Sequence, residues 1–585
     1  MRKSLAIVMV LMLTLVLVGT AAAEELDKKT LSDSMFEEIG EYGGQYSLSL
    51  GSSPQTFNYY GSLDQSSLSI MLNVFDSLTE PNPLTMEIEP ALASDWEIKD
   101  EGKTVIFHLR EGVEWSDGEP FTADDVIFTF NEIALNSDVE RSERDRFTLE
   151  GEVVEFSKID DMTVKAELPV AYGPFFDVLS HAPIFPKHQF EQYVSEDDPS
   201  KINDAWATDS DLSEIVGTGP YKLSSYSPDQ RVVLERNPNH WKFDPDGNRL
   251  PYVDQLEYLI IGSEEVQLAQ FESGAIDSLS ISGQDFTYLK QQEVDGADFS
   301  VYATASTAAI PSPTHFGFNF DVEDENLREA FRNVDFRIAL EYLMDRERII
   351  EEVYNTLAMK SGTPVFETFE EWYNPEIEEI RRENNIEKAA EILDELGYVD
   401  ENGDGYRQFP DGERLEFDLT SGTSSERSDI AGIVADKFEE VGIEVHLNLI
   451  DDSLVMDQAL AGDFQTIIMA YGNQPDPQFR KDVLQPGRDL YYMHQSIRGE
   501  DGTDKDLMFD WEAEVFDIFE EGQVTMEYEE RKELYDRWQV LFAENLPVIF
   551  LTKGMTVQAV QNDIGNLFLN EDDVIVNSNL TIFKK

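Results

Sequence analysis

Carboxylate side chains are concentrated in one short segment, which runs from Glu114 to Asp125 (EWSDGEPFTADD) and holds five acids in twelve residues. Paired carboxylates could act as the acid and base of a glycosidase, or bind a metal ion. The spacing favours a structural role. Asp117-Gly118 suits a tight turn, and Thr122 stands three residues before Asp125 as in a capping box. We therefore interpret these acids as a turn followed by a helix start.

A second acidic segment has the spacing of a cation-binding loop. Asp400, Asn402 and Asp404 fall at positions one, three and five of an EF-hand-type loop, Gly405 at position six and Tyr406 at position seven. Position twelve is Asp411 instead of the usual bidentate glutamate. Two interpretations stay open, a structural turn or a calcium site formed by these residues, and neither makes calcium a required cofactor. The ligand set of the calcium interpretation is Asp400, Asn402, Asp404, Tyr406 and Asp411.

Motifs of the common enzyme classes are missing from the sequence. The seven histidines are isolated, with no HExxH pair, and neither GxSxG nor GxxxxGK[ST] nor GxGxxG occurs. The absence of cysteine excludes disulfides, thiol nucleophiles and cysteine-ligated metals. We therefore expect a protein that is not an enzyme. A secreted glycosidase that uses two of the many carboxylates is the remote alternative, because no pair stands out.

The net charge of −74 is extreme for 585 residues, and the acids are spread along the whole chain. Such a chain repels nucleic acid phosphates, which argues against a nucleic-acid partner. Its self-repulsion weakens the compact state at low ionic strength and is screened at high salt. We interpret the composition as an adaptation to a saline habitat.

The N-terminus has the pattern of a secretory signal peptide. Arg2 and Lys3 precede an apolar run over residues 5–18, and residues 21–23 (AAA) suit a cleavage site after Ala23. The run is shorter than the roughly 20 residues of a membrane span, and an uncleaved anchor is the alternative. Since no cysteine is available for lipid attachment, the sequence predicts an exported protein that is free in the periplasm.

Strand-like and helix-like patterns alternate along the chain, which predicts an α/β or mixed α+β fold. Asp345 is expected to cap a second segment within a long helical region. Helices are expected at 327–354, 386–396 and 428–440, and strands at 104–110, 415–419 and 443–449.

Several motifs occur together and in order, and jointly they resemble the family 5 extracellular solute-binding proteins, the oligopeptide- and dipeptide-binding receptors of ABC importers. The longest is residues 108–126 (HLREGVEWSDGEPFTADDV). The others are residues 55–58 (QTFN), 217–221 (GTGPY), 236–241 (RNPNHW), 336–340 (FRIAL) with 344–346 (MDR), and 389–393 (AAEIL) with 397–398 (GY).

The resemblance implies a periplasmic-binding-protein-like type II fold, with two lobes, an extra inserted domain and a ligand cleft between the lobes. Lobe I would combine residues 44–85, 214–315 and 547–585. The inserted domain II would span 86–213, and lobe III would span 316–546. The lobes of such receptors close on the ligand by a hinge motion, and an importer distinguishes the closed form from the open one.

The resemblance also implies where the ligand binds. Peptide receptors of this family add the ligand main chain as a strand, and they hold its ammonium group with an aspartate three residues before an acid–proline pair. Here the pair is Asp476-Pro477, and the third residue before Asp476 is Asn473, which supplies no charge. The strand-addition segments correspond to Leu63, Asp64 and Gln65 and to Met469, Ala470 and Tyr471.

The leading hypothesis is therefore a monomeric receptor that delivers oligopeptides to the permease of an ABC importer. An oligosaccharide receptor of the same family is the alternative, because an amide at 473 and the many aromatic residues also suit sugars.

Overall fold

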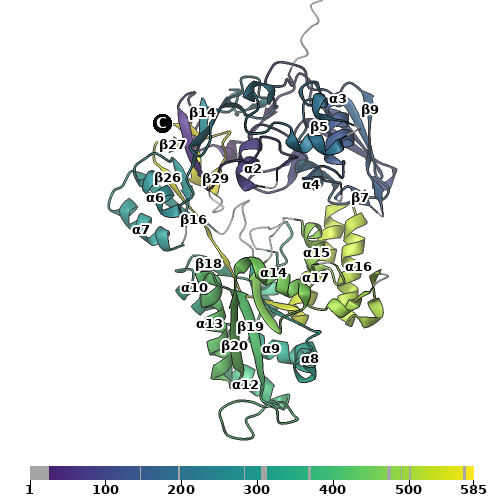
Figure 1. The fold of residues 1–585 in the computed structure, drawn as a ribbon, viewed down its shortest axis with the longest axis vertical. Coiled ribbons are helices and arrows are strands. Elements are labelled where there is room, and N and C mark those ends of the chain that lie inside the picture. Colours follow the sequence, from purple (N-terminus) through teal and green to yellow (C-terminus); the bar gives the residue numbers. More distant parts are fainter. Residues whose placement is uncertain are drawn as a thin grey trace, which may run out of the picture.

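The computed structural model describes residues 26–62, 64–144, 146–149, 151–195, 198–281, 283–304, 313–365, 371–470, 476–488, 490–499, 502–570 and 575–585. These residues form two bodies, which lie one above the other in Figure 1. The upper body contains the described residues between 26 and 304 and those from 556 onward, and the lower body contains those between 313 and 555. The predicted signal peptide lies outside the described residues.

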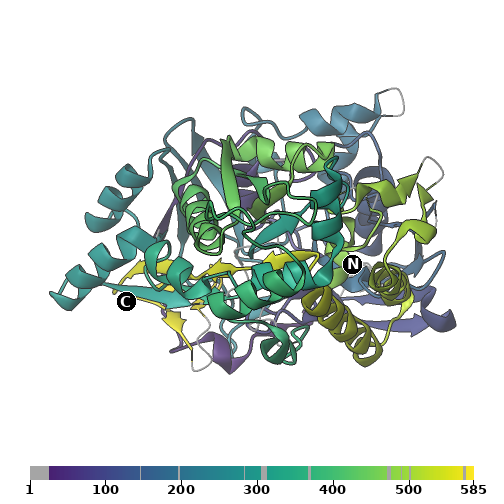
Figure 2. The same cartoon turned by 90° about the horizontal axis from the view of Figure 1, so that it is seen from below.

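Two sheets of the upper body combine distant parts of the chain. The first has the order β11 (Tyr221–Ser227), β12 (Arg231–Arg236), β14 (Gln255–Ile260) and β2 (Gln45–Leu50), with β2 parallel to β14. The second has the order β15 (Ser278–Ser280), β26 (Thr556–Gln561) and β16 (Phe299–Thr304). Figure 2 shows the yellow C-terminal strands among teal segments from the middle of the chain, as this pairing requires. The chain therefore returns to the upper body at its end.

An antiparallel sheet forms the centre of the predicted inserted domain. Its strand order is β5 (Ala93–Lys99), β6 (Thr104–Leu109), β10 (Thr163–Glu167) and β9 (Glu155–Asp160). Two short helices accompany it, α3 (Ala123–Phe128) and α4 (Phe175–Ser180). The strand expected at 104–110 is therefore confirmed as β6.

The acidic segment that begins at Glu114 has the structural role expected from its spacing. Gly118 adopts the left-handed region with φ = 95°, as a tight turn requires. Thr122 and Asp125 form the capping box of α3, in which the Thr122 N–H donates to the Asp125 carboxylate at 3.0 Å. Burial raises the pKa of Asp125, although it accepts N–H groups from Lys187 and Thr122. The segment builds a turn and a helix start.

The lower body is a five-stranded sheet covered by helices. The strand order is β20 (Glu444–Ile450), β19 (Glu416–Gly422), β21 (Thr466–Ala470), β17 (Thr314–Phe318) and β24 (Val548–Phe550). Strands β20, β19 and β21 are parallel, and β17 is antiparallel to both of its neighbours. The helices include α10 (Arg346–Glu352), α12 (Ile386–Glu395), α13 (Ser425–Glu440), α16 (Asp510–Val524) and α17 (Tyr528–Asn545).

The expected helix over 327–354 is three separate helices. They are α8 (Glu325–Arg332), α9 (Val334–Glu341) and α10. The break before α9 occurs at Asn333, whose side chain caps α9 by accepting the N–H of Asp335. Asp345 caps α10, as predicted, by accepting the N–H of Arg348 at 3.1 Å. Local capping therefore divides a continuous apolar pattern into segments.

Two large apolar cores lie in the two bodies. One contains Tyr46 and Leu256 of the upper sheets together with Phe107 of the inserted domain, and the other contains Phe316 and Ile468 of the lower sheet. Because the first upper sheet and the inserted domain share a core, we expect them to move together relative to the lower body. The domain ranges given above stay a prediction, and β24 pairs in the lower sheet, so the chain leaves that sheet after residue 550. Among the described residues, no helix is both long and apolar enough to cross a membrane.

Candidate ligand site between the two bodies

The carboxyl ends of three parallel strands meet at one edge of the lower sheet. Strands β20, β19 and β21 end there at Ile450, Gly422 and Ala470. Strand β17 begins at the same edge, with Thr314 beside Ala470, so this edge is where the chain enters the lower body. Ligands of open α/β sheets bind outside the carboxyl ends of the strands. This edge is therefore the candidate site.

Two of the predicted ligand residues lie at this edge. Met469 is buried in β21 opposite His315, whereas Ala470 is the last residue of the strand and is partly exposed. Tyr471, Asn473 and Leu63 lie outside the described residues. The contacts of all these residues with ligand stay a prediction.

The predicted segment around Asp64 begins a helix. Asp64 caps α2 (Gln65–Met71) by accepting the N–H of Ser67 at 2.9 Å, and Gln65 is the exposed first residue of that helix. Burial acts to raise the pKa of Asp64, but hydrogen bonds from Ser67 and Ser62 outweigh it and lower the pKa. Gln65 is helical, so its main chain is not extended as strand addition requires, and the contact of this segment with ligand stays a prediction.

A buried ion pair stands immediately after this edge. Asp476 caps the 3-10 helix η7 (Pro477–Arg480) and binds Arg531 of α17 through two contacts of 2.7 and 2.8 Å. Both side chains are less than a tenth exposed. Arg531 also donates to the Gly522 carbonyl and lies 5.0 Å from the ring centre of Trp372. In the sequence, Asp476 is recognised only as part of an acid–proline pair. Its partner Arg531 lies 55 residues further along the chain, so no local pattern predicts the ion pair.

A cavity of about 170 Å³ separates the inserted domain from the lower body beside this ion pair. Its lining includes Asp177 of the inserted domain and Glu371, Asp476 and Arg531 of the lower body. Aromatic and thioether side chains complete the walls, namely Phe176, Trp372, Tyr528, Met86 and Met526. Three carboxyl groups and one guanidinium thus line this cavity together with apolar side chains.

Two of these carboxyl groups have strongly raised pKa values. Burial raises the pKa of Asp177 to about 7, and the charge of Asp476 adds to the effect. Burial likewise raises the pKa of Glu371 to about 7, with contributions from the charges of Glu87 and Asp476. Desolvation and like charges both disfavour the ionised form. This cavity therefore disfavours further negative charge.

The loop at 400–406 is a closed turn held by its own side chains. Asp400 accepts the N–H groups of Gly403 and Gly405, and Asp404 accepts that of Tyr406 at 2.9 Å. The second oxygen of Asp404 pairs with Arg414 at 2.6 Å. Asp411 instead accepts the side-chain amide of Asn326 at 2.9 Å. The turn is thus present, and the calcium interpretation stays a prediction.

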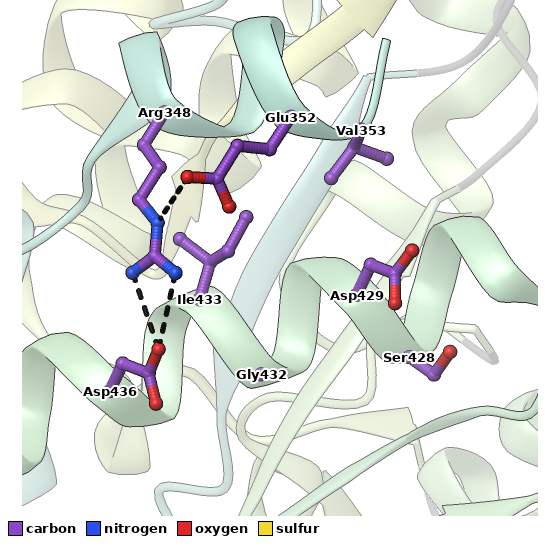
Figure 3. A pocket seen from close by; sticks show the side chains of 8 residues that line it. All are labelled: Arg348, Glu352, Val353, Ser428, Asp429, Gly432, Ile433 and Asp436. Carbon is purple, nitrogen blue, oxygen red and sulfur yellow. Dashed lines mark hydrogen bonds and ion pairs between the residues drawn. The ribbon is translucent and has the colours of Figure 1, made fainter.

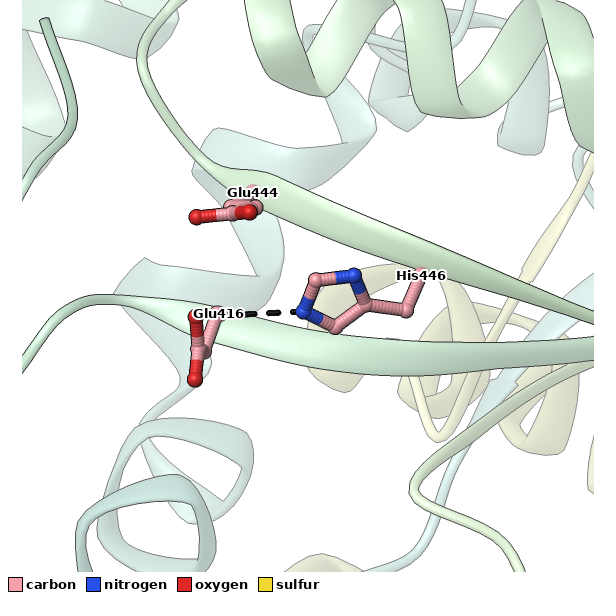
Figure 4. Close-up of side chains that lie close together, drawn as sticks. All are labelled: Glu416, Glu444 and His446. Carbon is pink, nitrogen blue, oxygen red and sulfur yellow. Dashed lines mark ion pairs between the residues drawn. The ribbon is translucent and has the colours of Figure 1, made fainter.

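Another group of possible metal ligands was not found from the sequence. Glu416, Glu444 and His446 each offer an atom within 4.8 Å of the others, on the neighbouring strands β19 and β20 (Figure 4). The register of β19 and β20 brings Glu416 close to Glu444 and His446. Because Glu416 is distant from the other two along the chain, no sequence pattern predicts the group. Glu444 already binds Arg414, and the group lies at the amino ends of the strands, opposite the candidate site.

A groove of about 310 Å³ lies between α10 and α13 (Figure 3). Arg348 on its wall is held by Glu352 at 3.0 Å and by Asp436 at 3.3 Å. Its charge is therefore already balanced, and we do not assign the ligand site to this groove.

The model of the bacterial extracellular solute-binding proteins, family 5, matches residues 87–484, more than half of the chain. The chain belongs to this family. Members are solute-binding receptors of transport systems, so the resemblance seen in the sequence is confirmed. The match includes both the inserted domain and the edge of the lower sheet described above.

Individual relatives of this family 5 protein cover most of its length. The periplasmic alpha-galactoside-binding protein of Rhizobium meliloti is 27% identical, and the match covers 91% of this chain and 80% of that protein. The oligopeptide-binding protein AppA of Bacillus subtilis is 24% identical, with 94% and 93% covered. A solved structure of an oligopeptide-binding protein OppA superposes with a TM-score of 0.77 at 24% identity, covering 94% of this chain and 92% of that one. This likeness confirms the type II periplasmic-binding fold.

The first prediction concerns the ion pair of Asp476 and Arg531. We expect Arg531→Met to destabilise the protein by about 3–5 kcal/mol, because it leaves a buried carboxylate without a cation. Arg537→Ala on the same helix is the control, since its partner Glu514 is exposed and the loss is expected to be under about 1 kcal/mol. Denaturant unfolding at constant salt measures both, and equal losses would contradict the structural role of the pair.

The second prediction concerns calcium. The calcium interpretation of the loop predicts that calcium raises the melting temperature, because a cation bound at 400–406 would relieve the repulsion between Asp400 and Asp404. Asp404→Ala removes a ligand and should abolish the shift. If calcium leaves the melting temperature unchanged, the loop is a structural turn and not a calcium site.

Proposed function

We propose that this family 5 protein captures oligopeptides between its two bodies and delivers them to an ABC-type importer. The observation that carries the proposal is the position of Ala470, the last residue of β21, at the carboxyl edge of the lower sheet and beside Thr314, where the chain enters the lower body. A peptide binds as an added strand along an extended main-chain segment, and we expect Met469, Ala470 and Tyr471 to offer that segment. The receptor function is non-enzymatic, and it requires no cofactor.

The chemistry of the neighbouring cavity supports a ligand that carries positive charge. Asp177, Glu371 and Asp476 line it with Arg531 as the single cation among them. A peptide offers an ammonium group and basic side chains to such a surface, whereas a neutral sugar does not. The names of two relatives, AppA and OppA, also refer to oligopeptides.

An oligosaccharide receptor is the second candidate, and one comparison specifically favours it. The Rhizobium meliloti relative is named for binding alpha-galactosides. Asn473 occupies the position at which the family's peptide receptors carry an aspartate, and an amide suits hydroxyl groups as well as ammonium. A secreted glycosidase that uses two of the carboxylates stays the remote alternative.

We further propose that the receptor acts as a monomer in the periplasm, after cleavage behind Ala23, and that its macromolecular partner is the permease of the importer. The N-terminal pattern and the absence of cysteine support this location. No nucleic-acid partner is expected for a chain with a net charge of −74.

The third prediction separates the two ligand classes. We expect short peptides to raise the melting temperature, because a ligand that binds only the folded form stabilises it. Cello-, xylo-, malto- and alpha-galacto-oligosaccharides should produce no shift at the same concentration. The reverse pattern would contradict the peptide assignment and support a sugar receptor.

A further inference from the structure

The two bodies touch at a point where the inserted domain has no room for a side chain. The N–H of Gly173 donates to the carbonyl of Gln523 at 2.9 Å. A Cβ atom at residue 173 would lie 2.5 Å from the Thr525 carbonyl oxygen and 2.7 Å from Nε of Arg531. The backbone of Gly173 is not in the left-handed region, so its own turn does not require glycine. Glycine is needed at residue 173 because the lower body leaves no space for a side chain there.

This contact lies away from the connection between the bodies. In Figure 1, α4 stands above α16 and α17 on the right, while the chain passes from the lower sheet to β26 further left. The rings of His181 and Phe479 also approach here, with centres 6.5 Å apart. A rotation about the connection would therefore separate these surfaces.

Closing this contact also brings carboxylates together. Asp177 belongs to the upper body, whereas Glu371 and the Asp476–Arg531 pair belong to the lower body. The four side chains line one cavity between the bodies. When the bodies separate, Asp177 and Glu371 regain water.

We propose that the Gly173–Asp177 surface is the closure latch of this receptor, and that the acids gathered around the Asp476–Arg531 pair make closure depend on pH. The inference rests on the proposed receptor function, because it describes the regulation of the same site. An importer that recognises the closed form would then receive fewer closed receptors as the surroundings become more alkaline.

The sign of the dependence follows from the raised pKa values of Asp177 and Glu371, both about 7 in this closed arrangement. An exposed carboxyl group has a pKa near about 4, so the closed form binds more protons than the open form between about pH 4 and 7. Closure is therefore strongest at acidic pH. It weakens as pH rises through this window, and it levels off above about pH 7.

The other charged groups near these acids do not reverse this sign. Burial lowers the pKa of His181, which opposes the effect of the acids below about pH 6.5, but it is one group against two whose pKa values both rise to about 7. Arg146 and Arg531 favour the ionised form of Asp177, yet burial still raises the pKa of that carboxyl group to about 7. The titratable and charged groups that act on Asp177 and Glu371 are Glu87, Arg146, Tyr172, His181, Asp476, Tyr528 and Arg531.

The fourth prediction is a closure experiment on the mature chain without ligand. Because the protein contains no cysteine, dyes can be attached specifically to Glu152→Cys and Glu530→Cys, exposed positions on the two bodies. Energy transfer is measured from pH 5 to 8 at a constant 1 M KCl, which screens the overall charge to a Debye length of about 3 Å. We expect the ratio of closed to open molecules to be at least about tenfold higher at pH 5 than at pH 8.

Two variants test the latch, each with a matched control. Asp177→Asn should close more at pH 8 and show a flatter pH profile, whereas Glu155→Gln, an exposed acid of the same domain, should behave as the parent. Gly173→Ala should reduce closure at every pH, whereas Gly51→Ala, which meets no atom within 4 Å, should not. Melting temperatures verify that each variant folds.

Three results would overturn the latch. They are a parent protein whose energy transfer is independent of pH, an Asp177→Asn profile equal to that of the parent, and a Gly173→Ala variant that closes normally. Since the experiment contains no ligand, such a failure leaves the choice between peptide and sugar unaffected. A failure of the ligand assignment likewise leaves the closure measurement valid.

Discussion

The buried ion pair between Asp476 and Arg531 is the interaction on which the arrangement of the candidate site depends. It joins the segment that follows β21 to α17, and Arg531 in turn holds the carbonyl at the end of α16 and the ring of Trp372. A buried charge without its partner is costly, so each member fixes the place of the other. The pair therefore positions one wall of the cavity between the inserted domain and the lower body, and also the surface that Gly173 contacts.

The two bodies are suited to a receptor that opens and closes. Each has its own large core, and that of the upper body joins its first sheet to the inserted domain. The carboxyl edge of the lower sheet, the entry of the chain at Thr314 and the cavity beside Asp476 lie between them. Closure can therefore surround a ligand without disturbing either core, and the cost of bringing three carboxylates together can be changed by pH.

Local features of the fold could be predicted from the sequence, because their causes lie within a few residues. Thr122 with Asp125 and Asp345 with Arg348 are caps whose partners stand three residues apart. The break at Asn333 was missed, since its apolar pattern continues on both sides. Contacts between distant residues gave no signal, as with Arg531, with Gly173 against Thr525, and with His446 beside Glu416. The family motifs indicated the class of receptor, but not the ligand that its cleft accepts.

The central claim is that a peptide occupies the space between the two bodies. Native mass spectrometry of the mature protein, mixed with equal amounts of a short-peptide library and an oligosaccharide series, tests it most directly. We expect one-to-one complexes whose added masses are those of peptides, and we expect these complexes to disappear when the protein is denatured. Complexes only with oligosaccharides, or none with either class, would contradict it.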